Sequence, residues 1–158
     1  MGEQRHRMGS GLAGSLQSSP TVGGGTLMLV AGYACRYGVC TNDNFVVAAG
    51  AFTRLIERGF SPRMLFAHDG EDVGKWIKIT QDEHGLFVVG EVVDSQVMVE
   101  VDAGRCRGLS LGRFVGVRKP IEGGVSLCVA ISALPEISIV HRPGNLGALI
   151  EAICAGAC

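Results

Sequence analysis

The residues from 75 to 93 read KWIKITQDEHGLFVVGEVV, and this stretch has the pattern of a β-hairpin. Lys75 to Thr80 and Leu86 to Val93 are rich in β-branched and aromatic residues, which favour strands. Between them lies the polar segment QDEHG, whose closing Gly85 suits a tight turn. The stretch therefore predicts an antiparallel pair of strands joined by a polar turn.

Segments on both sides of this hairpin also have the composition of strands. They are Thr26 to Arg36, Met64 to His68, Leu109 to Arg118, Val125 to Ala133 and Glu136 to His141. Many short strands with few helices predict a mainly β fold of the α+β type. We expect a bent or closed β-barrel with short helices around it.

Three segments instead have the periodicity of helices. Ala51 to Arg58 places Phe52, Leu55 and Ile56 on one face and is followed by Gly59 as a C-cap. A second helix, capped by Asp94 or Ser95 and ended by Gly104, carries Val97, Met98 and Val101. Leu146, Leu149, Ile150 and Ile153 recur at helical spacing and predict a closing amphipathic helix.

The first 25 residues differ in composition from the rest of the chain. They are rich in Gly and Ser and end in three consecutive glycines, which predicts a flexible tail over residues 1–25. Residues 26–158 have the length and apolar content of a single domain.

Charge and cysteine usage exclude several classes of protein. The formal net charge is −1, without the basic surplus that nucleic-acid binding normally requires, so we expect no nucleic-acid partner. No apolar run has the length of a membrane span, and no secretory signal follows the polar start. None of the six cysteines forms a Cys-x-x-Cys pair, so we expect reduced thiols in a protein that is not secreted.

Of the four histidines, His68 and His141 are the candidates for acid–base chemistry. His6 lies in the predicted tail and His84 in the hairpin turn. His68 follows the apolar segment from Met64 to Ala67, at a strand end where a scaffold can hold a side chain rigidly. The alternative is a partly exposed histidine without a chemical role.

Ser110 is the candidate nucleophile because it lies in the sequence GLSLG. Flanking glycines let the backbone approach a substrate and can leave N–H groups free for an oxyanion. The pattern also matches the nucleophile elbow of α/β-hydrolases, which would need Glu136 and His141 as partners. However, a helix must follow that elbow, and the residues after Gly112 have the composition of a strand.

Glu136 opens a strand on which Glu136, Ser138 and Val140 face the same side. From there a carboxylate could orient a histidine and stabilise its charged form. Asp69 and Asp72 beside His68 offer an alternative, a metal site, but no second ligand cluster supports it. We therefore expect no metal and no cofactor.

Several short motifs, taken in order, resemble the prohead serine proteases of tailed phages. They are Gly32-Tyr33-Ala34, Gly50-Ala51-Phe52, His68-Asp69, Gly74-Lys75-Trp76, Gly85-Leu86, Gly108-Leu109-Ser110-Leu111-Gly112, Glu136-Ile137-Ser138-Ile139-Val140 and Pro143-Gly144-Asn145. The resemblance covers roughly residues 27–152. It implies a fold similar to the herpesvirus assemblins, a bent β-barrel ringed by helices.

The resemblance also implies a site and an activity. Ser110 would be the nucleophile, His68 the general base and Glu136 the third member, in place of the second histidine of assemblins. Backbone N–H groups near Ser110, with Leu111 as the candidate, or those around His141 and Arg142, would bind the oxyanion.

The family's substrates are scaffold protein or the scaffold segment of the major capsid protein, and often the protease itself. The resemblance thus implies capsid and scaffold proteins as partners, a possible homo-oligomer and no membrane. The place of action would be the host cytoplasm, inside the immature capsid. The chain continues only to Cys158, so we expect the scaffold to be a separate protein or part of the capsid protein. The rival hypothesis is a catalytically silent domain of the same fold that binds capsid proteins during assembly.

Overall fold

The structure of the chain is a computed structural model that describes residues 25–156. Its strands are β1 (Leu27–Arg36), β2 (Phe45–Val47), β3 (Arg63–Phe66), β4 (Asp69–Gln81), β5 (Gly85–Val92), β6 (Gly108–Leu111), β7 (Val115–Pro120), β8 (Ser126–Ala133), β9 (Glu136–Val140) and β10 (Ile150–Gly156). Its helices are α1 (Thr53–Glu57), α2 (Ser95–Asp102) and the short 3₁₀ turn η1 (Glu122–Gly124). The predicted tail, residues 1–25, lies outside the described residues except for Gly25.

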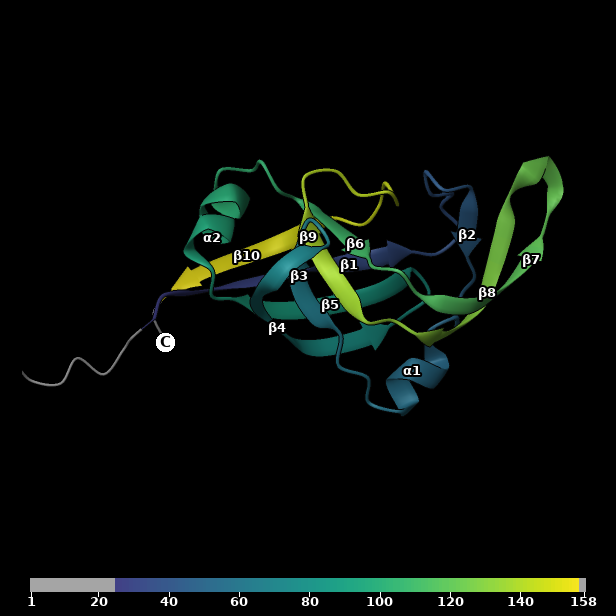
Figure 1. Cartoon of the computed structure of the whole chain (residues 1–158), viewed down its shortest axis with the longest axis horizontal. Helices are drawn as coiled ribbons and strands as arrows, with labels where there is room; N and C mark the ends of the chain where they lie inside the picture. The colour runs from purple at the N-terminus through teal and green to yellow at the C-terminus, as the bar shows by residue number, and fades with distance from the viewer. Residues whose placement is uncertain (1–24, 157–158) are drawn as a thin grey trace, which may run out of the picture.

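Seven strands form one strongly curved sheet in the order β10-β1-β5-β4-β3-β9-β6. Its neighbouring strands are antiparallel except for β3 and β9, which are parallel. The two edges meet at one end, where Gly108 bridges Leu149 and the Ile150 N–H donates to the Arg107 carbonyl at 2.8 Å. The predicted mainly β fold with a bent sheet is therefore confirmed (Figure 1).

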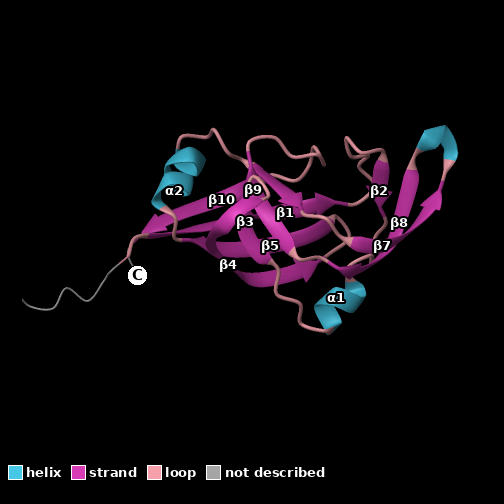
Figure 2. Cartoon of the chain, viewed as in Figure 1, coloured by secondary structure: helices cyan, strands magenta, loops and turns pink. Residues whose placement is uncertain are grey.

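A smaller sheet of β2, β8 and β7 projects from one side, and its outer hairpin forms an arm (Figure 1). The two helices lie at the periphery, as the predicted fold required (Figure 2). One hydrophobic core joins the parts: Val30 of β1, Phe52 before α1 and Ile131 of β8 all belong to it and are almost fully buried. Among the described residues the longest helix has 8 residues, which is too short for a transmembrane helix.

The hairpin of β4 and β5 confirms the prediction from residues 75–93, although β4 starts earlier, at Asp69. Asp82 closes the turn, because its Oδ1 accepts the N–H groups of His84 and Gly85. The Tyr33 hydroxyl donates to the other carboxylate oxygen at 2.6 Å. This bond, with the two backbone N–H groups, lowers the pKa of Asp82.

The first two predicted helices are also confirmed. Phe52 and Leu55 are buried on one side of α1, and Gly59 follows it with φ +68°. Asp94 caps α2 by accepting the N–H groups of Gln96 and Val97.

The predicted C-terminal helix is wrong, because residues 150–156 form the strand β10 instead. β10 pairs with β1, from Leu27 opposite Gly156 to Gly32 opposite Ile150. Of the four residues at helical spacing, Leu146, Leu149 and Ile153 are exposed and Ile150 alone is buried, so the spacing does not mark a buried helical face. The free edge of β1 offers unpaired backbone groups, and this non-local pairing outweighs the local helical pattern.

The predicted strand from Leu109 to Arg118 is also wrong as a single element. It divides into β6 in the large sheet and β7 in the small sheet. The break lies at residues 112–114, where Gly112 packs against Glu136 and the chain leaves the sheet.

Candidate catalytic site

His68 is presented by the turn between β3 and β4. The two strands pair Phe66 with Asp69, so Ala67 and His68 form a two-residue turn, with φ +52° and +63°. Positive φ at both central positions is typical of a type I′ hairpin and costs a non-glycine residue about 1–2 kcal/mol. Such strain persists only where the surroundings enforce it, and it is common at functional sites.

Two hydrogen bonds hold this strained turn against β9. The Ala67 N–H donates to the Ile139 carbonyl at 2.9 Å. The His68 N–H donates to Ser138 Oγ at 3.1 Å. Ser138 is fully buried and donates its own hydroxyl to Glu136 Oε2 at 2.6 Å. One buried hydroxyl thereby fixes both the backbone of His68 and the carboxylate of Glu136.

Ser110 lies on β6, which pairs with β9 in antiparallel register, Ser110 opposite Ser138. β9 also pairs with β3, which leads to His68. Because β9 pairs with both β3 and β6, it brings His68 and Ser110 close together although they are distant in the sequence. The parallel pairing of β3 with β9 is the feature that short-range sequence patterns cannot show.

The three candidate residues form a continuous chain of hydrogen bonds. Ser110 Oγ lies 3.0 Å from His68 Nε2, and His68 Nδ1 lies 2.6 Å from Glu136 Oε1. A carboxylate only accepts, so Nδ1 carries the proton and Nε2 is free to accept from the Ser110 hydroxyl. The arrangement can therefore activate a hydroxyl nucleophile.

Gly112 makes room for the carboxylate of this chain. A Cβ at position 112 would overlap the side chain of Glu136, including Oε1, which bonds His68. The Gly112 N–H donates to the Glu136 carbonyl at 2.9 Å. From the sequence, the glycines beside Ser110 were expected to let a substrate approach the backbone. The structure shows instead that Gly112 leaves space for the side chain of Glu136.

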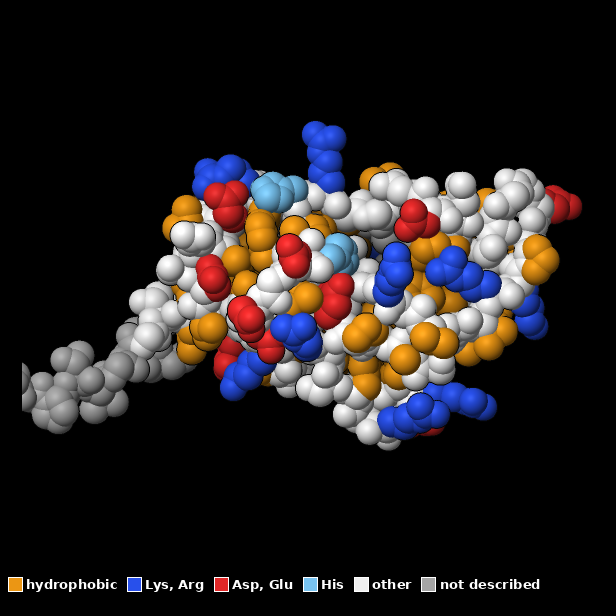
Figure 3. Space-filling model, viewed as in Figure 1, with side chains coloured by type: hydrophobic (Ala, Val, Ile, Leu, Met, Phe, Trp, Pro, Cys, Tyr) orange, Lys and Arg blue, Asp and Glu red, His pale blue; other side chains and the backbone are white. Residues whose placement is uncertain are grey.

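A cleft of about 610 Å³ opens at Ser110 and His68. Its walls include Phe45, Leu111 and Phe114, and two arginines, Arg113 and Arg118, also line it. The Arg118 guanidinium lies over the ring of Phe45 at 4.4 Å and near that of Phe114 at 5.1 Å. On the face in Figure 3, basic side chains lie over a patch of hydrophobic ones towards the β7–β8 arm.

The candidates for oxyanion binding differ in position. Leu111 lines the cleft next to Ser110, whereas Arg142 is exposed and is not among the lining residues. Gly144 and Asn145 of the same loop do line it. The buried Asn145 side chain bonds both backbone polar groups of Arg36, at 3.2 and 3.0 Å, which anchors the loop to β1.

The structure does not bring together the residues of the alternative sites. His141 lies against Phe66, with Nε2 3.8 Å from Glu100 Oε2, and the helix required after a nucleophile elbow is replaced by a turn and β7. Asp72 pairs with Arg63 at 2.7 Å. Neither an α/β-hydrolase triad nor a metal cluster at His68 forms among the described residues.

Two residues of the site were not identified from the sequence as functional. Ser138 was placed on the face of Glu136 by strand alternation, which was a usable signal, but its bond to His68 depends on tertiary structure. Asn145 entered the sequence analysis only as part of the Pro143-Gly144-Asn145 motif, and its bond to Arg36, 109 positions away, depends on tertiary structure.

The chain is similar to known proteins over most of its length. The family described as Caudovirus prohead serine protease matches residues 17–157. The "Prohead protease" of Enterobacteria phage HK97 is 29% identical in an alignment of 140 residues that covers 83% of this chain and 62% of that protein. The chain thus spans less than two thirds of the length of this relative.

Among solved structures, the varicella-zoster virus protease aligns with a TM-score of 0.53 and 13% identity, over 84% of this chain and 65% of that one. The KSHV protease in complex with a hexapeptide phosphonate inhibitor aligns with a TM-score of 0.48 and 12% identity, over 83% and 65%. The first of these similarities supports the assemblin-like fold. Because the family match extends over nearly the whole chain, the protein belongs to the caudovirus prohead serine protease family.

Proposed function

We propose that this protein is a serine endopeptidase with Ser110 as nucleophile, His68 as general base and Glu136 as the residue that orients His68. The observation that carries the proposal is the unbroken path of hydrogen bonds from Ser110 Oγ through the imidazole to the Glu136 carboxylate. Family membership supports the same activity.

The geometry fits acyl transfer. His68 Nε2 accepts the hydroxyl proton while Ser110 Oγ forms a bond to the carbonyl carbon of the peptide. Glu136 stabilises the imidazolium that forms, and the imidazolium then donates its proton to the leaving amine as the C–N bond breaks. Water, deprotonated by His68, next attacks the acyl-enzyme and releases Ser110 with its proton restored.

The oxyanion would be held by backbone N–H groups at the cleft. The Gly112 N–H is committed to the Glu136 carbonyl, so the Leu111 N–H is the better donor next to Ser110. Arg142 is the other candidate. Its side chain is exposed to solvent, so its loop would contribute backbone N–H groups rather than the guanidinium. Gly144 of the same loop lines the cleft, so its backbone N–H is a further candidate donor to the oxyanion.

The proposed substrates are scaffold protein or the scaffold segment of the major capsid protein, and the chain itself. This assignment rests on the name of the HK97 relative and on the family description. The proposed place of action is the inside of the immature capsid in the host cytoplasm. A cleft with apolar walls and arginines can accommodate an extended peptide with mixed side chains.

A serine-reactive fluorophosphonate probe tests the site. We expect the probe to add to Ser110 in the wild type, to fail in Ser110→Ala, and to react at least about 1,000-fold more slowly in His68→Ala. Peptide mapping by mass spectrometry identifies the labelled serine. Equal labelling rates in wild type and His68→Ala would contradict the proposed base.

A further inference from the structure

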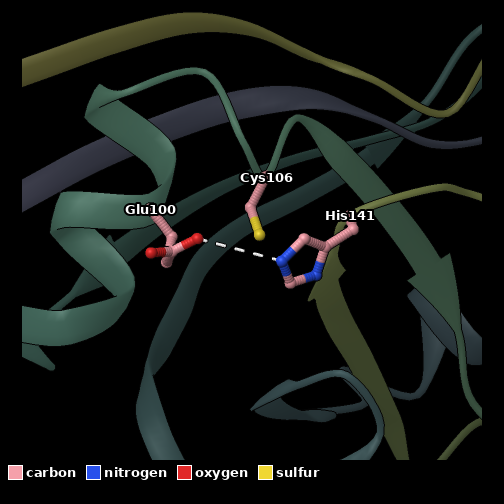
Figure 4. Close-up of side chains that lie close together, drawn as sticks. All are labelled: Glu100, Cys106 and His141. Atoms are coloured by element: carbon pink, nitrogen blue, oxygen red, sulfur yellow. Dashed lines mark ion pairs between the residues drawn. The ribbon is translucent and has the colours of Figure 1, made fainter.

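A second cluster of reactive side chains lies away from the triad. The donor atoms of Glu100, Cys106 and His141 all lie within 4.8 Å of one another (Figure 4). Glu100 Oε2 is 3.8 Å from His141 Nε2, and the Cys106 thiol lies between the carboxylate and the ring (Figure 4). None of these side chains takes part in the proposed peptidase chemistry.

The backbone fixes the positions of all three residues. Glu100 lies in the last turn of α2, and its carbonyl accepts the N–H groups of Arg105 and Cys106 at 3.0 and 3.2 Å. Cys106 then leads into β6, and His141 directly follows β9. Gly108 of β6 pairs with Val140 of β9, and this pairing holds the nearby residues Cys106 and His141 side by side. The cluster is therefore organised before any ligand arrives.

Access and polarity also suit a small cation. Cys106 is fully buried, Glu100 is partly buried, and the His141 side chain is 57% exposed. Glu100 and His141 line a hollow of about 910 Å³, through which a cation and its water can enter.

We infer that Glu100, Cys106 and His141 bind a zinc ion, with water in the fourth position. Thiolate, imidazole and carboxylate are the donors that zinc takes in proteins, and the soft thiolate disfavours magnesium and calcium. On binding, the Cys106 thiol releases its proton to water, and His141 binds through the unprotonated nitrogen of a neutral imidazole. The site would join α2 to the strand pair that carries Ser110 and Glu136.

The Arg105 guanidinium would compete with the zinc ion for the Glu100 carboxylate. Its guanidinium pairs with both oxygens of Glu100, at 2.8 and 3.0 Å. A carboxylate has about four acceptor positions, so about two remain after the two bonds from Arg105, and a metal can take one of them. Removing the guanidinium should then strengthen metal binding, whereas an ion-pair cluster without a metal role would simply be weakened.

The test uses the full-length, untagged chain in a Ser110→Ala background, freed of metal with a chelator and titrated with Co²⁺ and then Zn²⁺. We expect one equivalent of Co²⁺ to bind with a thiolate-to-metal charge-transfer band, and Zn²⁺ to displace it. Cys106→Ser should abolish the band and weaken Zn²⁺ binding by roughly 100-fold or more. Cys40→Ser, at an exposed thiol, is the matched control and should leave both unchanged.

Two further variants keep the test decisive if Cys106→Ser folds poorly. His141→Ala changes an exposed side chain and should also weaken Zn²⁺ binding by roughly 100-fold. Arg105→Gln should strengthen Zn²⁺ binding, because its side chain no longer pairs with both oxygens of Glu100. Absence of the charge-transfer band, or equal affinities in wild type, Cys106→Ser and His141→Ala, would overturn the inference.

Discussion

At the scale of single residues, the proposed catalytic triad depends on neighbours that would take no part in the chemistry. Ser138 holds the His68 backbone and the Glu136 carboxylate at once, and Gly112 leaves space for that carboxylate. Ser110, His68 and Glu136 were all identified from the sequence, and the structure brings them together. The contacts that hold these three residues in place were not predicted from the sequence, because each contact depends on the pairing and register of the strands.

Gly112→Ala should impair catalysis without unfolding the protein. The new Cβ would overlap the Glu136 side chain and displace the carboxylate from His68. A displacement of about 1 Å in such a site lowers the rate by roughly 100-fold. The measurement is kcat/KM with circular dichroism as the folding check. Gly156→Ala, where a Cβ meets no atom within 4 Å, should have wild-type activity; wild-type activity in Gly112→Ala would refute this role.

Ser138→Ala should lower both stability and turnover. The substitution leaves the His68 N–H and Glu136 Oε2 without a buried partner, which costs about 1–3 kcal/mol of unfolding free energy. We expect kcat to fall at least about tenfold with little change in KM, because orientation rather than substrate binding is lost. Ser132→Ala, at an exposed strand serine, is the control. Equal loss of kcat in both variants would show that Ser138 does not position the site.

At the scale of elements, the accuracy of prediction follows the range of the interactions. The β4–β5 hairpin, α1 and α2 have their signals within a few residues, in turn glycines and the Asp94 cap. β10 is the opposite case, since residues 150–156 form a strand by pairing with β1, whose residues lie 118 to 129 positions earlier in the chain. The division of β6 from β7 likewise depends on the contact of Gly112 with Glu136.

Asp82 in the β4–β5 turn should make the free energy of unfolding depend on pH in the acid range. The pKa of this carboxyl is lowered in the folded state, so its stabilising contribution is present above its ordinary pKa of 3.8. That contribution is lost as the pH falls through the lower, folded value. Melting temperatures from pH 6 down to about pH 2 should therefore fall less steeply in Asp82→Asn than in the wild type. Glu83→Gln, in the same exposed turn, should follow the wild-type curve, and parallel curves for all three proteins would contradict the assignment.

At the scale of the whole molecule, the bent sheet and single core agree with what composition and the ordered motifs predicted. Aliphatic residues fill the core, as the low aromatic content of 6% requires. The closure of the sheet at Gly108 and Leu149 was not predictable, because it joins segments that have no common local pattern.

The core also protects its cysteines. Cys35, Cys106 and Cys128 are buried, whereas Cys40 and Cys154 are exposed. Burial raises the pKa of Cys35 to about 12, which leaves almost no thiolate at pH 8. In iodoacetamide labelling followed by peptide mass spectrometry, Cys40 and Cys154 should react fully before Cys35 and Cys128 react measurably. Denaturant should remove the difference, and rapid labelling of Cys35 in the native protein would show that the core is more open than the structure indicates.

The most direct test of the central claim is co-expression of the chain with the capsid and scaffold proteins from its own particle. Intact masses are compared for wild type, Ser110→Ala and His68→Ala. The proposal predicts a defined truncation of capsid or scaffold protein with the wild type and none with either variant. If all three samples contain only full-length proteins that are soluble and associated, the chain is a non-catalytic assembly domain and the proposed peptidase activity is wrong.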